Sequence, residues 1–377
     1  MADIFDYIYW RGDLKITYEN FTDVDGMVLS RLSYLPFDGF VPKQLDEKVT
    51  LRQAAEKVLA SEENLTNILW KKDTELLKKA AESERFGNIF VSGYINIVED
   101  NPQVQFAAII FELDDSHRFI SYRGTDNTIV GWQEDFNLFF MFPLPSQELA
   151  LSYFEEAVKK LGGSFILGGH SKGGNLAIYS ASFCMREYQK HISKIYNLDG
   201  PGFDREAISE SGFIYIRDKI FTYVPQSSIF GMMFEHDESY TVIKSNRKGF
   251  LQHDIYSWEI EPTTFVTLND VTNTSVFFDH TLSDFVEKMN NEERKTFSEA
   301  IFNILKTTED RTFNEILANW FKDTGQILKS LKNLDSETRS LIASTILSFI
   351  KCAGNNFSDV NPIRNEILKL RAKETRS

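Results

Sequence analysis

Cysteine is scarce in this sequence, which has two in 377 residues. Cys184 and Cys352 lie far apart and lack the paired spacing of a zinc site or a redox-active disulfide, so we expect both to be buried apolar side chains. No other group of residues has the spacing of a metal or nucleotide site. We therefore expect neither a metal nor a cofactor.

Long apolar runs are also missing. No stretch reaches the roughly 18 apolar residues that a membrane-spanning helix requires. The first residues, MADIFDYIYW (1–10), carry early acidic side chains and no apolar core of the kind found in signal peptides. These absences predict a soluble cytoplasmic protein without stable membrane insertion.

Positive charge falls short of negative charge, because 41 Lys and Arg residues stand against 55 Asp and Glu residues. The formal net charge of −14 repels polyanions, so we expect no nucleic-acid partner. Hydrophobic residues make up 42% of the chain and charged residues 25%, which is the balance of an ordinary folded protein. The 32 Phe residues indicate a well-filled core or an apolar substrate pocket.

The pattern of the chain changes twice. Residues 1–100 look helical and peripheral, and residues 281–377 have a helical pattern throughout. Between them, short apolar β-forming runs alternate with amphipathic stretches, which predicts an α/β fold with a mainly parallel sheet and helices on its faces. These runs are 104–113, 118–124, 165–169, 194–200, 219–224 and 240–245. We expect one domain over 1–280, with a helical N-terminal part over 1–100, and an all-helical C-terminal module over 281–377.

A Gly-x-Ser-x-Gly motif occupies 169–173 (GHSKG), between the predicted strand at 165–169 and a predicted helix at 175–191. In α/β-hydrolases this motif carries the nucleophile on a strained strand-to-helix turn, where a Cβ at either glycine would collide with nearby backbone. The helix N-terminus then points amide groups at the charge that develops on the substrate. In this context the motif predicts an α/β-hydrolase fold, with Ser171 as the nucleophile of a serine hydrolase.

A serine nucleophile needs an imidazole to take its proton and a carboxylate to orient that imidazole, and the chain order in this fold is Ser, acid, His. The histidines after Ser171 are His191, His236, His253 and His280. His191 ends the helix after the motif and His280 lies at the edge of the helical module, so both are poor candidates. We favour His253, which follows the last predicted strand, and keep His236 as the alternative.

Asp199 is the predicted acid, because it stands at the C-terminal end of the strand predicted at 194–200, where catalytic groups of parallel sheets gather. Asp204, Asp237 and Asp254 remain as alternatives. An oxyanion hole needs the backbone amide after the nucleophile, which is that of Lys172, and a second donor from a loop after an earlier strand. The turn at Gly124–Thr125 provides such a loop.

Three segments in this order and spacing resemble the class 3 lipases: SYRGTD (121–126), GWQEDFN (131–137) and GGHSKGGNLA (168–177). Four others resemble more closely the Mbeg-like family, a bacterial branch of lipase-like α/β-hydrolases. They are IFDYIYWRGDL (4–14), VDGMVLSRLSYL (24–35), PQSSIFGMMFEHDESYTVIKSN (225–246) and QHD (252–254). The resemblance covers about residues 1–260. It implies Thr125 and the Lys172 amide as oxyanion donors, Ser171 as nucleophile and His253 as base.

The sequence departs from the class 3 lipases at the acid. That family usually places its acid in a turn similar to D-I-V-P, and the matching turn here begins with Ser228. Pancreatic-type lipases use a different acid, in a turn similar to G-L-D-P-A. The segment NLDGPG (197–202) resembles that turn and puts Asp199 in the same role.

Two apolar runs, NLFFMFPLP (137–145) and IFGMMF (229–234), line an acyl pocket or belong to the core. The pocket interpretation predicts a small-molecule acyl ester or lipid as substrate, cleaved through an acyl-Ser171 intermediate. The alternative is a catalytically silent hydrolase fold that acts as a binding or scaffold protein. Its main support is the serine, Ser228, at the usual acid position.

Overall fold

The computed structural model of the protein describes residues 1–68, 70–101, 103–126, 129–138, 141–272 and 275. The chain divides into two compact units, one formed by 1–126 with 145–271 and the other by 127–144 with 272–377. The first unit contains the whole described sheet and every residue predicted for the active site. Helix α6 (Ile129–Asn137) belongs to the second unit, and the module predicted over 281–377 lies outside the described residues.

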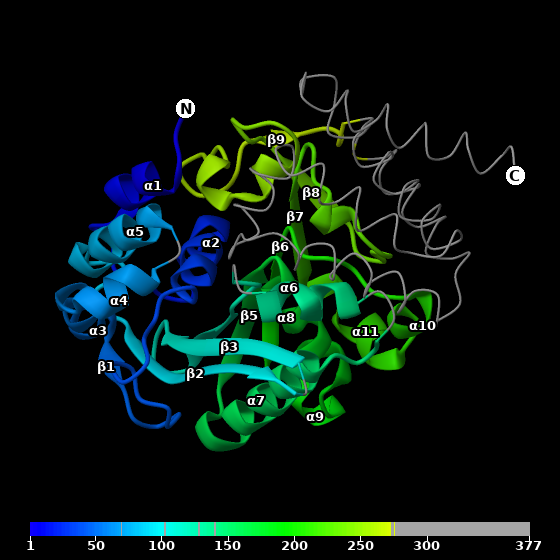
Figure 1. The fold of residues 1–377 in the computed structure, drawn as a ribbon, viewed down its shortest axis with the longest axis horizontal. Coiled ribbons are helices and arrows are strands. Elements are labelled where there is room, and N and C mark those ends of the chain that lie inside the picture. Colours follow the sequence, from blue (N-terminus) through cyan, green and yellow to red (C-terminus); the bar gives the residue numbers. More distant parts are fainter. Residues whose placement is uncertain (69, 102, 127–128, 139–140, 273–274, 276–377) are drawn as a thin grey trace, which may run out of the picture. The chain divides into compact units, whose positions relative to one another are not determined.

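A nine-stranded sheet crosses the described residues, with its strands side by side in chain order (Figure 1). The strands are β1 (Val49–Thr50), β2 (Phe90–Asp100), β3 (Gln103–Glu112), β4 (His117–Tyr122), β5 (Ser164–His170), β6 (Ile192–Leu198), β7 (Ile220–Pro225), β8 (Tyr240–Ile243) and β9 (Thr267–Leu268). Strands β4 to β8 are parallel, whereas β1 to β4 pair antiparallel, as do β8 and β9. The predicted α/β fold with a parallel central sheet is confirmed, and each predicted run overlaps a strand.

The sequence pattern missed β2, because residues 1–100 look helical. This strand pairs antiparallel with β3, and the register shifts between Ser92 and Ile95. Such a bulge interrupts the alternation of side chains by which a strand is recognised in a sequence. The last helix before β2 ends at Glu82, so the helical part is shorter than predicted.

Helices precede β1, and helices or 3-10 turns lie in most of the connections between the strands. They are α1 (Ile4–Arg11), α2 (Asp23–Leu32), α3 (Leu51–Ala60), α4 (Glu62–Asn67), α5 (Lys71–Glu82), α7 (Pro145–Leu161), α8 (Lys172–Phe183), α9 (Arg186–Gln189), α10 (Arg205–Ile208) and α11 (Ser211–Ile216), with 3-10 turns η1 (Arg217–Lys219), η2 (Phe230–Met232), η3 (Gly249–His253) and η4 (Ile255–Ser257). The helix predicted at 175–191 is in fact two helices, α8 and α9. Gln189 donates from its side chain to the carbonyls of Ala181 and Ser182 and so satisfies the end of α8. Cys184 follows α8 and is buried as expected.

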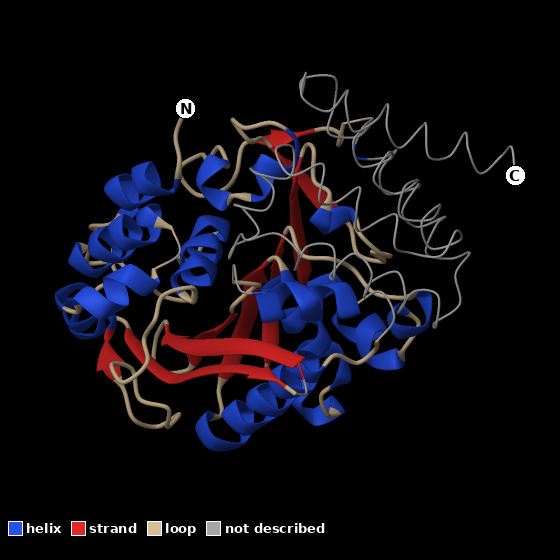
Figure 2. Ribbon diagram, viewed as in Figure 1, coloured by secondary structure: helices blue, strands red, loops and turns tan. Residues whose placement is uncertain are grey.

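Both faces of the parallel strands are buried, and successive residues point to opposite faces. Phe119 and Ile166 pack into one core with α1, α2, α3 and α5, whereas their neighbours Ile120 and Leu167 pack into a second core with α7, α8 and α11. Helices therefore lie on both sides of the sheet (Figure 2). The prediction that the N-terminal helices are peripheral is wrong, because every residue of α2 from Val24 to Leu32 is buried.

Two buried ion pairs, Arg31–Asp73 and Arg85–Asp25, lie among the N-terminal helices. The Arg85 guanidinium donates to the carboxylate of Asp25, and both side chains have no exposed surface. Arg85 also donates to the carbonyl oxygens of Leu14 and Asn20 at 3.0 and 2.9 Å. The buried charges are thus paired and hydrogen-bonded, which is the condition under which burial is tolerated.

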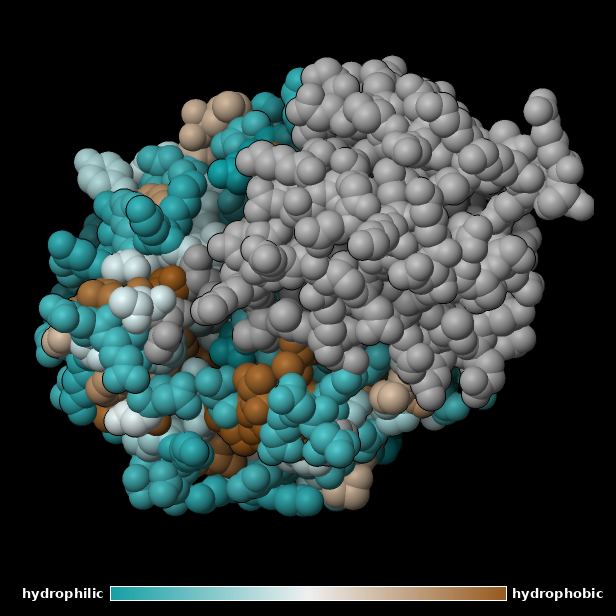
Figure 3. Space-filling model, viewed as in Figure 1, coloured by the Kyte–Doolittle hydropathy of each residue, from teal (hydrophilic) through white to brown (hydrophobic). Residues whose placement is uncertain are grey.

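The surface of the described part is mostly hydrophilic on the face shown in Figure 3, with apolar side chains gathered over β2, β3 and α7. Among the described residues, none of the helices combines the length and the apolar character needed to cross a membrane.

Substitution of Arg85→Met should lower the free energy of unfolding by about 3–5 kcal/mol, because it leaves the Asp25 carboxylate buried without its partner. Urea denaturation monitored by circular dichroism measures this change. The matched control is Arg205→Met, which removes an ion pair with Glu235 whose arginine side chain is 76% exposed. Equal losses in the two variants would contradict the role assigned to the buried pair.

Candidate active site

Ser171 forms the turn between β5 and α8, as the motif predicts. Its backbone has φ 60° and ψ −133°, a conformation that is costly for any residue other than glycine. A hydrogen bond from its amide to the carbonyl of Leu198, 2.9 Å long, holds it to β6. A Cβ on Gly173 would lie 2.1 Å from the carbonyl oxygen of Tyr122, so a glycine is required there. The turn therefore has the strained geometry of a nucleophile elbow.

Asp199 and His253 are brought together at the C-terminal end of the parallel strands. The His253 ring donates from Nδ1 to Asp199 Oδ2 at 2.7 Å. Asp199 directly follows β6 and is fully buried, whereas the His253 side chain, at the end of η3, is 22% exposed. Because Nδ1 faces the carboxylate, Nε2 is the ring nitrogen left for proton transfer. This is the arrangement by which an acid fixes the tautomer and orientation of a general base.

His170, the residue before Ser171, links the turn to His253. Its Nε2 donates to the His253 carbonyl at 2.8 Å, and the two rings lie 4.5 Å apart between centroids. Nδ1 of His170 is then an acceptor for the Tyr34 hydroxyl, at 3.2 Å. Burial, together with the nearby His253 and Arg31, lowers the pKa of His170 well below 6.5. A neutral imidazole thus holds the backbone of the predicted base beside the predicted nucleophile.

The two segments predicted for the oxyanion hole lie next to each other. Lys172 is the first residue of α8, so its amide stands at the helix N-terminus. A Cβ on Gly124 would lie 3.1 Å from Ser171 Cβ, which places the Gly124–Thr125 turn against Ser171. The Lys172 side chain is buried, and its Nζ donates to the backbone and side-chain oxygens of Gln105, both at 2.9 Å.

The alternative histidines have other partners. His236 bonds through Nδ1 to Glu238 at 2.9 Å, and Thr222 donates to the same carboxylate at 2.7 Å. Burial alone would raise the pKa of Glu238. The hydrogen bond and charge of His236 act in the opposite direction, and the net effect is a lowered pKa. His191 contacts the carbonyl of Gly163 at 2.6 Å, and His280 lies outside the described residues.

The alternative acids also have other contacts. Asp204 is exposed at the start of α10, and Asp237 pairs with Arg217 at 2.8 Å. Asp254 accepts from the amide of Tyr256 at 3.1 Å and pairs with Arg247. Asp199 differs from these in accepting a hydrogen bond from the ring of the favoured base, His253, at 2.7 Å.

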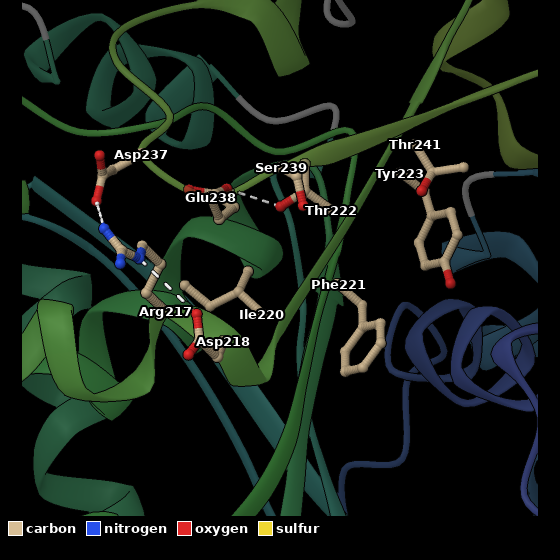
Figure 4. Close-up of a pocket in the computed structure, with 10 residues that line it drawn as sticks. All are labelled: Arg217, Asp218, Ile220, Phe221, Thr222, Tyr223, Asp237, Glu238, Ser239 and Thr241. Atoms are coloured by element: carbon tan, nitrogen blue, oxygen red, sulfur yellow. Dashed lines mark hydrogen bonds and ion pairs between the residues drawn. The ribbon is translucent and has the colours of Figure 1, made fainter. Parts of the chain in front are cut away.

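A pocket of about 430 Å³ lies beside β7 and β8 (Figure 4). Its lining is largely polar and includes the paired Arg217 and Asp237 as well as Glu238. Ser171, Asp199 and His253 do not line it. We therefore do not assign this pocket to the site around Ser171.

The parallel strands, the helices on both faces and the serine turn after β5 define an α/β-hydrolase fold. The chain belongs to the Mbeg1-like family, whose model matches residues 80–303. This match confirms the resemblance found in the sequence.

Comparison with solved structures finds similarity to a mutant form of the MDLA protein from Penicillium cyclopium, with 11% identity and a TM-score of 0.38 over 64% of this chain and 83% of that one. It also finds similarity to M37 lipase, with 15% identity and a TM-score of 0.35 over 56% of this chain and 70% of that one. No curated protein matches the chain. Because both TM-scores lie below 0.5, the fold class rests on the sheet and the turn themselves.

The buried neutral His170 predicts a pH-dependent stability. Its folded-state pKa lies well below the unfolded value of 6.5, so it stabilises the fold above pH 6.5, and this contribution is lost as the pH falls. The difference in unfolding free energy between wild type and His170→Asn should shrink by about 1.4 kcal/mol from pH 7.5 to 5.5. Urea titrations measure it, with the interval from pH 7.5 to 8.5 as the control in which the difference stays constant. A constant difference down to pH 5.5 would contradict the neutral state.

Proposed function

We propose that this protein is a serine hydrolase that cleaves acyl esters, including lipids, through an acyl-Ser171 intermediate. The observation that carries the proposal is the 2.7 Å hydrogen bond between His253 and the buried Asp199. The same histidine is tied through its carbonyl to His170, which adjoins the strained serine turn. The proposed nucleophile follows β5, the acid follows β6 and the base lies in η3 after β8, which is the chain order typical of the fold.

In the proposed reaction His253 Nε2 takes the proton of Ser171 as its oxygen attacks the ester carbonyl. The negative charge on the carbonyl oxygen is met by the Lys172 amide and by Thr125. His253 then gives its proton to the leaving alcohol, and the acyl group remains on Ser171. A water molecule activated by the same imidazole releases the acid. Asp199 stays ionised and stabilises the imidazolium in both steps.

An apolar side chain beside the base supports an acyl group as the substrate. The Phe230 ring lies 4.6 Å from the His253 ring between centroids. It belongs to the apolar run 229–234, which the sequence suggested as a pocket lining. A site bounded by such side chains favours hydrocarbon chains over sugars or peptides.

The alternative, a catalytically silent scaffold, rests on the serine at position 228, where class 3 lipases usually carry the acid. The contact between Asp199 and His253 provides a carboxylate from the end of β6 instead. This contact supports the enzyme over the silent fold, because it offers an acid although residue 228 is a serine.

A fluorophosphonate probe tests the nucleophile. We expect stoichiometric labelling of the wild type and complete loss of labelling in Ser171→Ala, because the probe reacts with an activated serine hydroxyl. Mass spectrometry of the labelled peptide locates the adduct. Unchanged labelling in Ser171→Ala, or a wild type that does not react, would rule out the proposed nucleophile.

Hydrolysis of p-nitrophenyl esters of graded acyl length tests the base and the acid. His253→Ala should abolish turnover, and Asp199→Asn should lower kcat by about 10⁴, as expected when the imidazole loses its orienting carboxylate. The matched control is His236→Ala, which removes a histidine side chain that is 7% exposed and paired with Glu238, and it should leave turnover nearly unchanged. A larger loss in His236→Ala than in His253→Ala would transfer the role of base to His236.

A further inference from the structure

The turn after β7 encloses the second oxygen of Asp199. Ser228 donates a hydrogen bond from its hydroxyl to Asp199 Oδ1, while His253 binds Oδ2. Both Ser228 and Asp199 are buried, with 2% and 0% of their surface exposed. Each oxygen of the Asp199 carboxylate thus has its own hydrogen-bond donor, Ser228 for Oδ1 and His253 for Oδ2.

The Ser228 hydroxyl has a defined direction. Its oxygen accepts a hydrogen bond from the amide of Gly231 at 3.0 Å, so its proton is directed at the carboxylate. Gly231 packs closely against both oxygens of the hydrogen bond between Ser228 and Asp199. A Cβ at that position would lie 2.2 Å from Asp199 Oδ1 and 3.0 Å from Ser228 Oγ. The backbone of this turn therefore fits around a carboxylate that projects from the neighbouring strand.

We propose that Ser228 is a positioning residue for the acid, and that it acts on the reaction through Asp199 and His253. The proposal rests on the proposed hydrolase function. A carboxylate held at one oxygen alone rotates about its Cβ–Cγ bond, and its plane then no longer matches the imidazole. With Ser228 on Oδ1, that rotation is blocked and Oδ2 stays directed at His253 Nδ1.

The electrostatics of the site favour this role. An ionised carboxylate without exposed surface needs hydrogen bonds to both oxygens, and a charge-assisted bond is stronger than a neutral one. Ser228 supplies such a bond without adding a second charge beside Asp199. A second acid at position 228 would instead place two carboxylates in contact, which disfavours ionisation of the pair. The serine at the usual acid position thus complements Asp199.

Ser228→Ala tests the proposal through kcat and KM on a p-nitrophenyl ester. We expect kcat to fall by about 10- to 100-fold, the effect of losing one hydrogen bond to a charged group, with KM within about twofold of wild type. The matched control is Ser182→Ala, which removes an equally buried hydroxyl that donates to the carbonyl of Ile178 at 2.8 Å. This control should leave kcat unchanged.

A second measurement detects the hydrogen bond between His253 and Asp199 directly and does not depend on enzyme activity. The Nδ1 proton of His253 should give a strongly downfield NMR resonance, identified by its loss in His253→Ala. We expect that resonance to shift or broaden in Ser228→Ala and to stay in place in Ser182→Ala. When the wild type is active, the proposal requires both the fall in kcat and the change in this proton. Either one alone, or neither, would overturn it.

The two proposals fail in different ways. A wild type without esterase activity or fluorophosphonate labelling would defeat the proposed function, and the NMR measurement would still decide whether Ser228 holds the acid. An active wild type with an unimpaired Ser228→Ala variant would leave the hydrolase intact and remove the role of Ser228.

Discussion

A carboxylate buried without exposed surface at the end of β6 is the constraint on which the site depends. Such a charge is tolerated only when hydrogen bonds replace its water, and Asp199 obtains them from His253 in η3 and from Ser228 after β7. Those partners lie 54 and 29 residues away along the chain. The parallel order of β6, β7 and β8 brings them within reach, because consecutive strands all end at the same edge of the sheet.

The two residues of the site with a strained backbone, Ser171 and Asp199, are each hydrogen-bonded to the neighbouring strand. Ser171 and Asp199 each follow the last residue of a strand, and each has a positive φ of 60° or 55°. The amide of Ser171 donates to Leu198 and that of Asp199 to Tyr223, so each is tied to the next strand of the sheet. Strain of this kind persists only where the surroundings over-determine the conformation. The sheet edge supplies that rigidity and keeps the side chains in place.

The N-terminal helices contact the candidate active site through buried polar side chains. Tyr34 reaches His170 from the end of α2, and the guanidinium of Arg31 lies 4.4 Å from the Tyr34 ring centroid. Arg31 is itself paired with Asp73 of α5 at 2.6 Å. A continuous set of buried polar contacts therefore runs from α5 through α2 to the backbone of His253. In this arrangement the first 82 residues hold the loop that carries the predicted base.

The sequence alone determined the α/β class and the strand–serine–helix unit, because both depend on local periodicity and on glycines at fixed offsets from Ser171. It also ranked Asp199 and His253 first, from their positions after predicted strands. Only the tertiary structure decided which oxygen of Asp199 faces His253 and what Ser228 and Tyr34 contact. Those contacts join residues that are 29 to 136 positions apart, and the sequence holds no local signal for them. Likewise, the burial of α2 and the bulged β2 follow from packing against the sheet, which composition and periodicity do not encode.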